Sequence, residues 1–245
     1  MASKPHTDDV YRPKRIPKNP IKFKLQLNEE QKQAKAVILE NTITLLAGGA
    51  GSGKTLLACN VALDGLLRRM YDKIIITRPT VSKEEIGFLP GDLREKMDPW
   101  VQPIYQNFYQ LYDKVKIEKL IEDGKIEIVP VSFMRGRTFL DSMIIVDEAQ
   151  NVTHEQMEMI TSRIGLRSKM MICGDSHQTD LKKKSDSGFK FLYTAARKIK
   201  NLEAITLTTN HRDSIVEDLL KYYQEAVERG ISITTSGSYI YNNKN

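Results

Sequence analysis

The stretch "LLAGGAGSGKTLLACNVAL", residues 45–63, decides the fold, because it sets four glycines within six residues between two apolar runs. The run before the glycines predicts a buried strand over residues 42–48. The run after them predicts a helix over residues 53–69. Glycine allows backbone conformations and close approaches that side chains would block, so a ligand is expected between strand and helix.

Residues 48–55 match the pattern G-x-x-x-x-G-K-[ST], the P-loop, which cradles phosphates with backbone N–H groups at a helix N-terminus. Lys54 is expected to reach the β- and γ-phosphate oxygens, and Thr55 to ligate Mg²⁺. The motif predicts ATP and Mg²⁺ as ligands. The nucleotide-binding residues that it predicts are Gly48, Gly49, Ala50, Gly51, Ser52, Gly53, Lys54 and Thr55.

A second motif, "MIIVDEAQN" (residues 143–151), has two acidic residues at the end of an apolar run. In a parallel sheet this places them at the carboxyl edge, where ligands of open α/β sheets bind. We expect Asp147 to hold the metal and Glu148 to act as the general base.

Two glutamines complete the predicted site. Gln178 follows another strand end, "ICGDSHQTD" (residues 172–180), and is expected to sense the γ-phosphate or to position water. Gln31 lies 17 residues before Gly48, and its amide, which both donates and accepts, is expected to contact adenine.

The rest of the chain alternates short apolar runs with helical patterns, which predicts βαβ units in a mostly parallel sheet with helices on both faces. The predicted class is therefore α/β. The further strands are expected at residues 73–77, 126–131, 142–147, 168–174 and 203–208.

The 245 residues are 40% hydrophobic, and no apolar stretch approaches the ~20 residues that cross a bilayer. Cys59 and Cys173 lie in apolar segments without metal-ligand spacing, which favours buried free thiols. Together these features predict a protein without membrane contact in a reducing cytoplasm.

Residues 1–24 carry +5 of the net charge of +6, together with four of the nine prolines. Such composition predicts an extended arm, suited to a phosphate backbone, to a neighbouring subunit or to solvent alone. A single domain is expected over residues 25–235, with an insertion at residues 80–125 and a C-terminal tail at residues 236–245.

Aromatic side chains gather in the insertion, where they fit either a packed helix or a surface on which nucleic-acid bases stack. Packing is the favoured interpretation. These residues are Trp100, Tyr105, Phe108, Tyr109 and Tyr112.

Together the motifs resemble the RecA-like core of superfamily-one helicases, and more closely the PhoH-like ATPase family, over about residues 25–230. The segments that carry the resemblance are "ITRPTV", "EEIGFLPGDLREKMDPWVQPIY", "FMRGRTF", "IIVDEAQNVTHEQMEMITSRIG", "SKMMICGDSHQTDL" and "SGF". The resemblance implies a RecA-like P-loop ATPase that binds and hydrolyses ATP, associates with nucleic acid and forms hexameric rings. The size suits a phage-encoded member. Some members carry a PIN-type ribonuclease domain before this core, where the present chain has the basic arm.

By the same resemblance, Gln31 contacts adenine, Gln178 senses the nucleotide and Arg212 is the arginine finger. The other candidates for the finger or for phosphate contacts are Arg78, Arg135, Arg137 and Arg163. Because the chain has room for one RecA-like lobe, the finger is expected from a neighbouring copy, which implies a homo-oligomer.

The leading hypothesis is thus an oligomeric ATPase that translocates on, or unwinds, single-stranded RNA or DNA. Its first alternative is a nucleotide-switched binding module that grips nucleic acid without unwinding it. A small-molecule kinase and a ribonuclease are further alternatives, and the two acidic and glutamine-containing motifs argue against the kinase.

Overall fold

The computed structural model describes residues 23–79, 93–175, 187–196, 198–211, 213–228, 231–233 and 239–241. The chain forms two compact units, residues 1–209 and 210–245. The predicted end of the domain at residue 235 falls within the second unit, and the domain limits remain a prediction. Most of the predicted basic arm, and residues 80–92 of the predicted insertion, lie outside the described residues.

A six-stranded sheet forms the centre of the first unit, in the order β3-β2-β4-β5-β1-β6. Every pairing in it is parallel. The strands are β1 (Ile43–Gly48), β2 (Lys73–Thr77), β3 (Ile126–Ile128), β4 (Ser142–Val146), β5 (Lys169–Gly174) and β6 (Leu202–Leu207). The order places β5 between β1 and β4, so the carboxyl end of β5 lies between the ends of the strands that precede the two predicted motifs.

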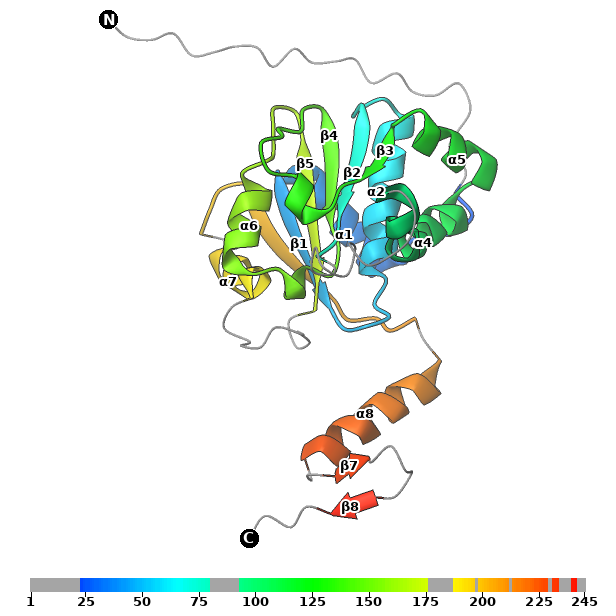
Figure 1. The fold of residues 1–245 in the computed structure, drawn as a ribbon, viewed down its shortest axis with the longest axis vertical. Helices are drawn as coiled ribbons and strands as arrows, with labels where there is room; N and C mark the ends of the chain where they lie inside the picture. Colours follow the sequence, from blue (N-terminus) through cyan, green and yellow to red (C-terminus); the bar gives the residue numbers. More distant parts are fainter. Residues whose placement is uncertain are drawn as a thin grey trace, which may run out of the picture. The chain divides into compact units, whose positions relative to one another are not determined.

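Helices cover both faces of this sheet (Figure 1). One face carries α1 (Glu29–Glu40), α2 (Lys54–Leu67), α4 (Leu93–Leu111) and α5 (Lys114–Glu122). The other carries α6 (His154–Thr161) and α7 (Gly188–Ala195), with the 3-10 helices Val131–Phe133 and Ala149–Asn151. The predicted α/β fold, a mostly parallel sheet flanked by helices, is confirmed.

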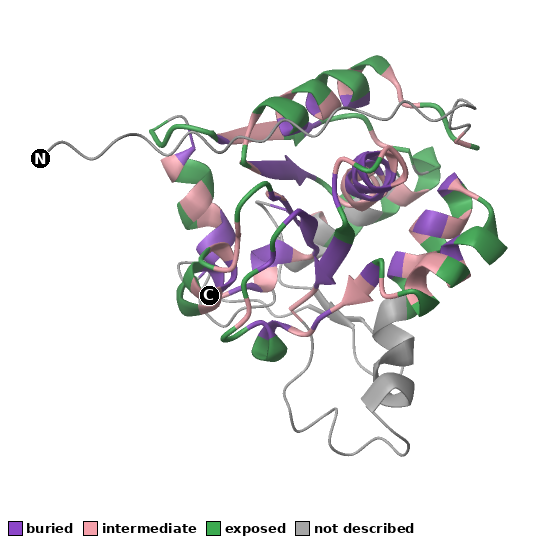
Figure 2. Cartoon of the chain, turned by 90° about the horizontal axis from the view of Figure 1, so that it is seen from above, coloured by how far each residue is buried: buried purple, intermediate pink, exposed green. Residues whose placement is uncertain are grey.

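Alternate side chains of the inner strands pack into two separate hydrophobic cores on opposite faces of the sheet, as the two-residue period of a strand requires. On β2, Ile74 and Ile76 face the core beneath α2, whereas Ile75 faces the core beneath α6. Burial on both faces explains why these strands are continuous apolar runs, and Figure 2 draws the inner strands in purple.

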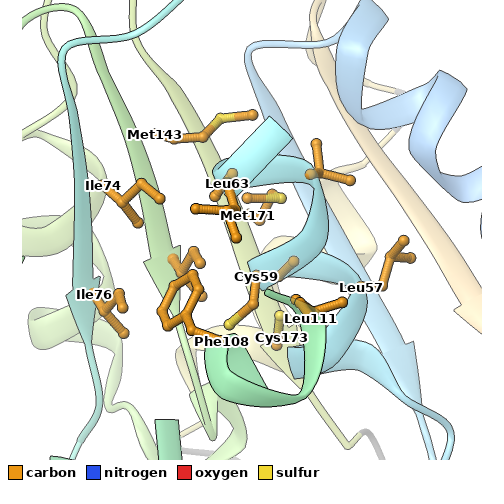
Figure 3. Packing of buried hydrophobic residues seen from close by; sticks show 14 of the residues in the cluster. Leu57, Cys59, Leu63, Ile74, Ile76, Phe108, Leu111, Met143, Met171 and Cys173 are labelled. Atoms are coloured by element: carbon orange, nitrogen blue, oxygen red, sulfur yellow. The ribbon is translucent and has the colours of Figure 1, made fainter. Parts of the chain in front are cut away.

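The helix α4 packs into the core beneath α2, because Phe108 is fully buried there beside Cys59 and Cys173 (Figure 3). The favoured interpretation of the aromatic cluster, packing, is therefore confirmed for Phe108. Both cysteines are buried and free, as predicted, and burial raises the pKa of each thiol.

The last residues of the predicted arm contact α4. Phe23 lies edge-on to Tyr112, with ring centroids 6.3 Å apart, and the backbone N–H of Lys24 donates to the carbonyl of Leu111 at 2.9 Å. These contacts attach the start of the described chain to the helix α4.

The second unit contains α8 (Ser214–Glu228) and the antiparallel pair of β7 (Ile231–Ile233) and β8 (Tyr239–Tyr241). Within the described part of the chain, no helix is long and apolar enough to cross a membrane.

Candidate nucleotide-binding site

The glycine-rich loop joins the end of β1 to the start of α2, as predicted. Gly48 has a φ of 152°, and a Cβ there would lie 2.5 Å from the carbonyl oxygen of Leu207 on β6. Gly53, the residue before α2, is left-handed with a φ of 80°, and no side chain caps the helix. The loop therefore closes against the sheet while the first N–H groups of α2 are left without a side-chain acceptor, which suits an anion.

The Lys54 side chain folds back over this loop. Its Nζ donates to the carbonyl oxygens of Gly48 at 2.7 Å and Gly49 at 2.8 Å, with Ser52 Oγ at 3.4 Å. The ammonium group thus lies against the backbone of the loop, near where a phosphate chain would need a positive charge.

A short hydrogen bond joins the two predicted motifs. Thr55 Oγ1 donates to Asp147 Oδ1 at 2.6 Å, across 92 residues of sequence. Asp147 is only 5% exposed, and its backbone N–H donates to the carbonyl of Thr77 at 2.8 Å, which extends the pairing of β4 with β2. A hydroxyl and a carboxylate held in contact at a sheet edge are the oxygen ligands that Mg²⁺ uses in such sites.

Burial raises the pKa of Asp147, and the neighbouring charge of Glu148 raises it further. The hydrogen bond from Thr55 and the charge of Arg78 act in the opposite direction. A buried carboxylate that is costly to ionise gains from a cation beside it, so these residues fit a bound magnesium ion.

Glu148 adopts a left-handed backbone conformation, with a φ of 50° and a ψ of 38°. Such strain in a non-glycine residue is typical of functional positions. Its carboxylate is held from two sides, because Gln150 Nε2 donates to Oε2 at 2.6 Å and an Arg78 guanidinium nitrogen lies 3.5 Å from Oε1. A second Arg78 nitrogen, Nε, lies 3.9 Å from Asp147 Oδ2.

Gln150 connects this acidic pair to the end of β5 and the start of α7. Its Oε1 accepts from the backbone N–H of Asp175 at 3.0 Å, and its carbonyl accepts from Ser187 Oγ at 3.0 Å. Sequence reasoning assigned no role to Gln150, although the signal was its place in "DEAQ". Arg78 was expected only as an alternative finger or as a phosphate contact, not as a partner of the acidic pair.

Gln31 lies in the first turn of α1, an element that carries neither the P-loop nor the acidic pair. Its side-chain oxygen accepts from the backbone N–H of Asn28 at 3.1 Å, and its own N–H donates to Asn28 Oδ1 at 2.8 Å. Both bonds form a capping box that starts the helix. The predicted adenine contact remains a prediction.

The remaining predicted residues fall into two groups. Gln178 and Arg212 lie outside the described residues, so their roles stay predictions. Arg137 and Arg163 bond to other parts of the first unit, and Arg135 is exposed. Within the described ranges, none of these three arginines bonds to the P-loop or to the acidic pair.

The model of the PhoH-like protein family matches residues 25–224 of this chain. The chain belongs to that family. It is 40% identical over 200 residues to a PhoH-like protein of Synechocystis, covering 81% of this chain and 60% of that protein. It is 38% identical over 167 residues to the protein PhoH of Escherichia coli K12, covering 67% and 47% of the two chains. This PhoH-like chain therefore spans about half of the curated relatives that it matches.

Among solved structures, the chain is similar to the Pif1 helicase of Candida albicans and to the large terminase of a thermophilic bacteriophage. The first match has a TM-score of 0.44 and 18% identity, and covers 80% of this chain and 44% of the helicase. The second has a TM-score of 0.49 and 11% identity, and covers 80% of this chain and 50% of the terminase.

Proposed function

We propose that this PhoH-like protein binds ATP with Mg²⁺ at the P-loop and hydrolyses it while bound to single-stranded nucleic acid. The observation that carries the proposal is the 2.6 Å hydrogen bond from Thr55 to Asp147, which brings a P-loop hydroxyl and a buried carboxylate into contact. This pair, the lysine beside it and the adjacent glutamate are among the parts that phosphoryl transfer to water requires.

Each residue has a role that follows from its position. The backbone N–H groups of residues 49–55 bind the phosphates, and Lys54 exchanges its carbonyl partners for phosphate oxygens. Thr55 and Asp147 hold Mg²⁺, which when bound neutralises charge on the β- and γ-phosphates. Glu148 orients the attacking water and accepts its proton.

The charge that develops on the transferred phosphoryl group needs a further cation, and an arginine finger is worth about 10³–10⁵ in rate. We assign this role to Arg212, supplied by a neighbouring copy in a head-to-tail ring, which the family resemblance suggests is hexameric. Gln31 contacts adenine and Gln178 senses the γ-phosphate in this proposal.

The test is ATP turnover with and without single-stranded RNA and DNA, using Lys54→Ala as the blank. Removing the Lys54 ammonium group should lower kcat at least about 10²-fold, because that group stabilises charge in the transition state. Lys198→Ala is the matched control, since Lys198 is an exposed lysine between α7 and β6. Turnover of Lys54→Ala equal to that of the wild type would contradict ATP hydrolysis at this site.

A strand-displacement assay separates unwinding from binding alone. An ATPase that unwinds should displace a labelled strand only with hydrolysable ATP. If the protein binds the strand and hydrolyses ATP without displacing it, the nucleotide-switched binding module is the better description.

A further inference from the structure

The segment between β3 and β4, residues 129–141, is fixed to the core at four points. Val129, Val131, Met134 and Phe139 are 2%, 9%, 0% and 5% exposed, and all four pack in the core beneath α6. The backbone turns between these anchors, with hydrogen bonds from Phe133 to Pro130 and from Met134 to Val131 at 2.9 and 3.2 Å. The shape of the segment is therefore set by its own backbone and by the core.

Two arginines hold this segment to its neighbours. The Arg137 guanidinium donates twice to the Glu127 carboxylate, at 2.9 and 3.2 Å, and lies 4.8 Å from the centre of the Phe139 ring. Arg163 reaches the carbonyl of Arg137 at 3.4 Å. Both cations already have structural partners, which leaves the third arginine of the region to be explained.

The outward side of the segment presents groups that the fold does not use. Phe133 is 51% exposed, and the exposed Arg135 side chain has no hydrogen bond or ion pair within the described ranges. Ser132 and Thr138 are also exposed. We call Ser132, Phe133, Arg135 and Thr138 the 132–138 surface. Residues 129–140 contain no aspartate or glutamate, so the surface combines an aromatic ring with hydrogen-bond donors and one positive charge.

We propose that the 132–138 surface binds single-stranded nucleic acid, with a base stacked on Phe133 and a phosphate at Arg135. Every base offers a flat face that an aromatic ring can stack on, and a single strand leaves that face accessible, whereas a duplex does not. The absence of carboxylates favours an anionic partner over a second copy of this chain. The inference rests on the proposed function, since it names the residues through which that function contacts its nucleic acid.

The direct test is fluorescence anisotropy with labelled oligo-uridine and oligo-thymidine of about 20 nucleotides, longer than the roughly 4–16 nucleotides that one single-strand binding fold covers. Phe133→Ala should weaken binding about 5- to 150-fold, the range expected for losing one stacked base, and Phe133→Trp should preserve it. Arg135→Ala should weaken binding and lower the slope of log affinity against log salt by about 0.7, the share of one phosphate contact.

Matched controls come from the same unit. Phe191 on α7 is 60% exposed and Arg69 after α2 is exposed, so Phe191→Ala and Arg69→Ala remove the same side-chain types elsewhere. Neither should change binding. All four alanine variants should melt close to the wild type, because exposed substitutions rarely change stability by more than about 0.5 kcal/mol.

Three outcomes would overturn the inference. If the wild type binds the strand and Phe133→Ala and Arg135→Ala bind equally well, the surface is elsewhere and the proposed function stands. If the wild type binds no strand at all, the nucleic-acid part of the proposed function fails as well. If binding is unchanged but the two variants alter the sedimentation of the protein alone, the surface joins copies of this chain.

Discussion

At the scale of single residues, Gln150 makes the shorter of the two contacts that hold the carboxylate of the candidate base, Glu148. It donates to the Glu148 carboxylate and accepts from the backbone of Asp175, so it holds the candidate base relative to the end of β5. Gln150 is only 6% exposed, and a buried amide with partners on both sides has little freedom to move.

Replacing Gln150 should therefore impair hydrolysis more than binding. In Gln150→Ala we expect kcat to fall about 10²-fold, the typical result of a catalytic group displaced by about 1 Å, with the KM for ATP little changed. In Gln150→Glu the new carboxylate still accepts from the Asp175 N–H but repels Glu148. This variant should therefore show the same fall in kcat although the bond to Asp175 is preserved. Steady-state kinetics measure both constants.

The control for this prediction is Gln33→Ala, which removes an exposed glutamine from α1. A kcat within twofold of the wild type in both Gln150 variants would mean that Glu148 needs no orientation from Gln150.

Gly48 and Gly49 should respond differently to the same substitution. In Gly48→Ala the new Cβ would lie 2.5 Å from the carbonyl oxygen of Leu207, at a φ that side chains rarely adopt, so we expect a loss of about 1–3 kcal/mol in the free energy of unfolding. Gly49→Ala meets no atom within 4 Å and should fold as stably as the wild type. Urea denaturation measures both, and equal losses would contradict the close approach at Gly48.

The sequence could indicate residues of the candidate site only where a local motif contains them. The P-loop and the acidic pair were assigned from their own patterns, and the structure brings Thr55 and Asp147 into contact. The bonds of Gln150 to Glu148 and Asp175 depend on how the 3-10 helix after β4 meets the end of β5. No local pattern encodes that meeting, because it depends on tertiary packing.

At the scale of elements, buried parallel strands were the easiest to predict, because burial on both faces makes them continuous apolar runs. The strand predicted at residues 126–131 is shorter, β3 ending at Ile128, because Pro130 precedes a 3-10 turn over Val131–Phe133. The pair of β7 and β8 was not predicted, since strands of three residues are too short to show an alternating pattern.

One further contact between elements could not be predicted from the sequence. Glu30 on α1 accepts from the backbone N–H groups of Thr208 and Thr209 and from the Thr208 hydroxyl, after β6. These bonds, above all that from the Thr208 N–H, lower the pKa of Glu30 from 4.5 to about 2. They tie the start of α1 to the segment that follows β6.

This contact predicts a pH dependence with a definite sign. A lowered pKa means that the stabilisation is complete above the unfolded value of 4.5 and is lost as the pH falls through about 2. The melting temperature of Glu30→Gln should therefore lie below that of the wild type at neutral pH, and the gap should close as the pH falls from about 4.5 towards 2. Thermal melts across this range measure it.

Glu29→Gln is the control, because Glu29 shares the first turn of α1 and, among the described residues, its carboxylate pairs only with Lys32 on the same helix. Its melting temperature should follow the wild type at every pH. A Glu30→Gln gap that does not change with pH would mean that the carboxylate charge adds nothing to this contact.

At the scale of the whole molecule, the described residues of the first unit form one sheet with one candidate nucleotide site, while position 212 falls in the second unit. If the finger comes from a neighbouring copy, ATP turnover per protein molecule should rise with protein concentration as the oligomer forms. Arg212→Ala should lose turnover and retain ATP binding. Steady-state assays over a range of protein concentrations, with calorimetry for binding, test both.

Mixing provides the decisive control. Arg212→Ala and Lys54→Ala copies are each inactive in this proposal, but a mixed oligomer holds interfaces with one intact lysine site facing one intact arginine. Activity that reappears on mixing supports a shared site. A turnover that is independent of concentration, with no recovery on mixing, would place the finger within one chain.

The bonds from Lys54 to the carbonyls of Gly48 and Gly49 mean that its ammonium group already has hydrogen-bond acceptors within the loop. A polyphosphate must compete for this ammonium group, so the heat released on association is the difference between the bonds formed with phosphate and those broken within the loop. Truncating the side chain consequently shifts both ends of the reaction, and a melting curve recorded without ligand is needed before its effect on affinity can be interpreted.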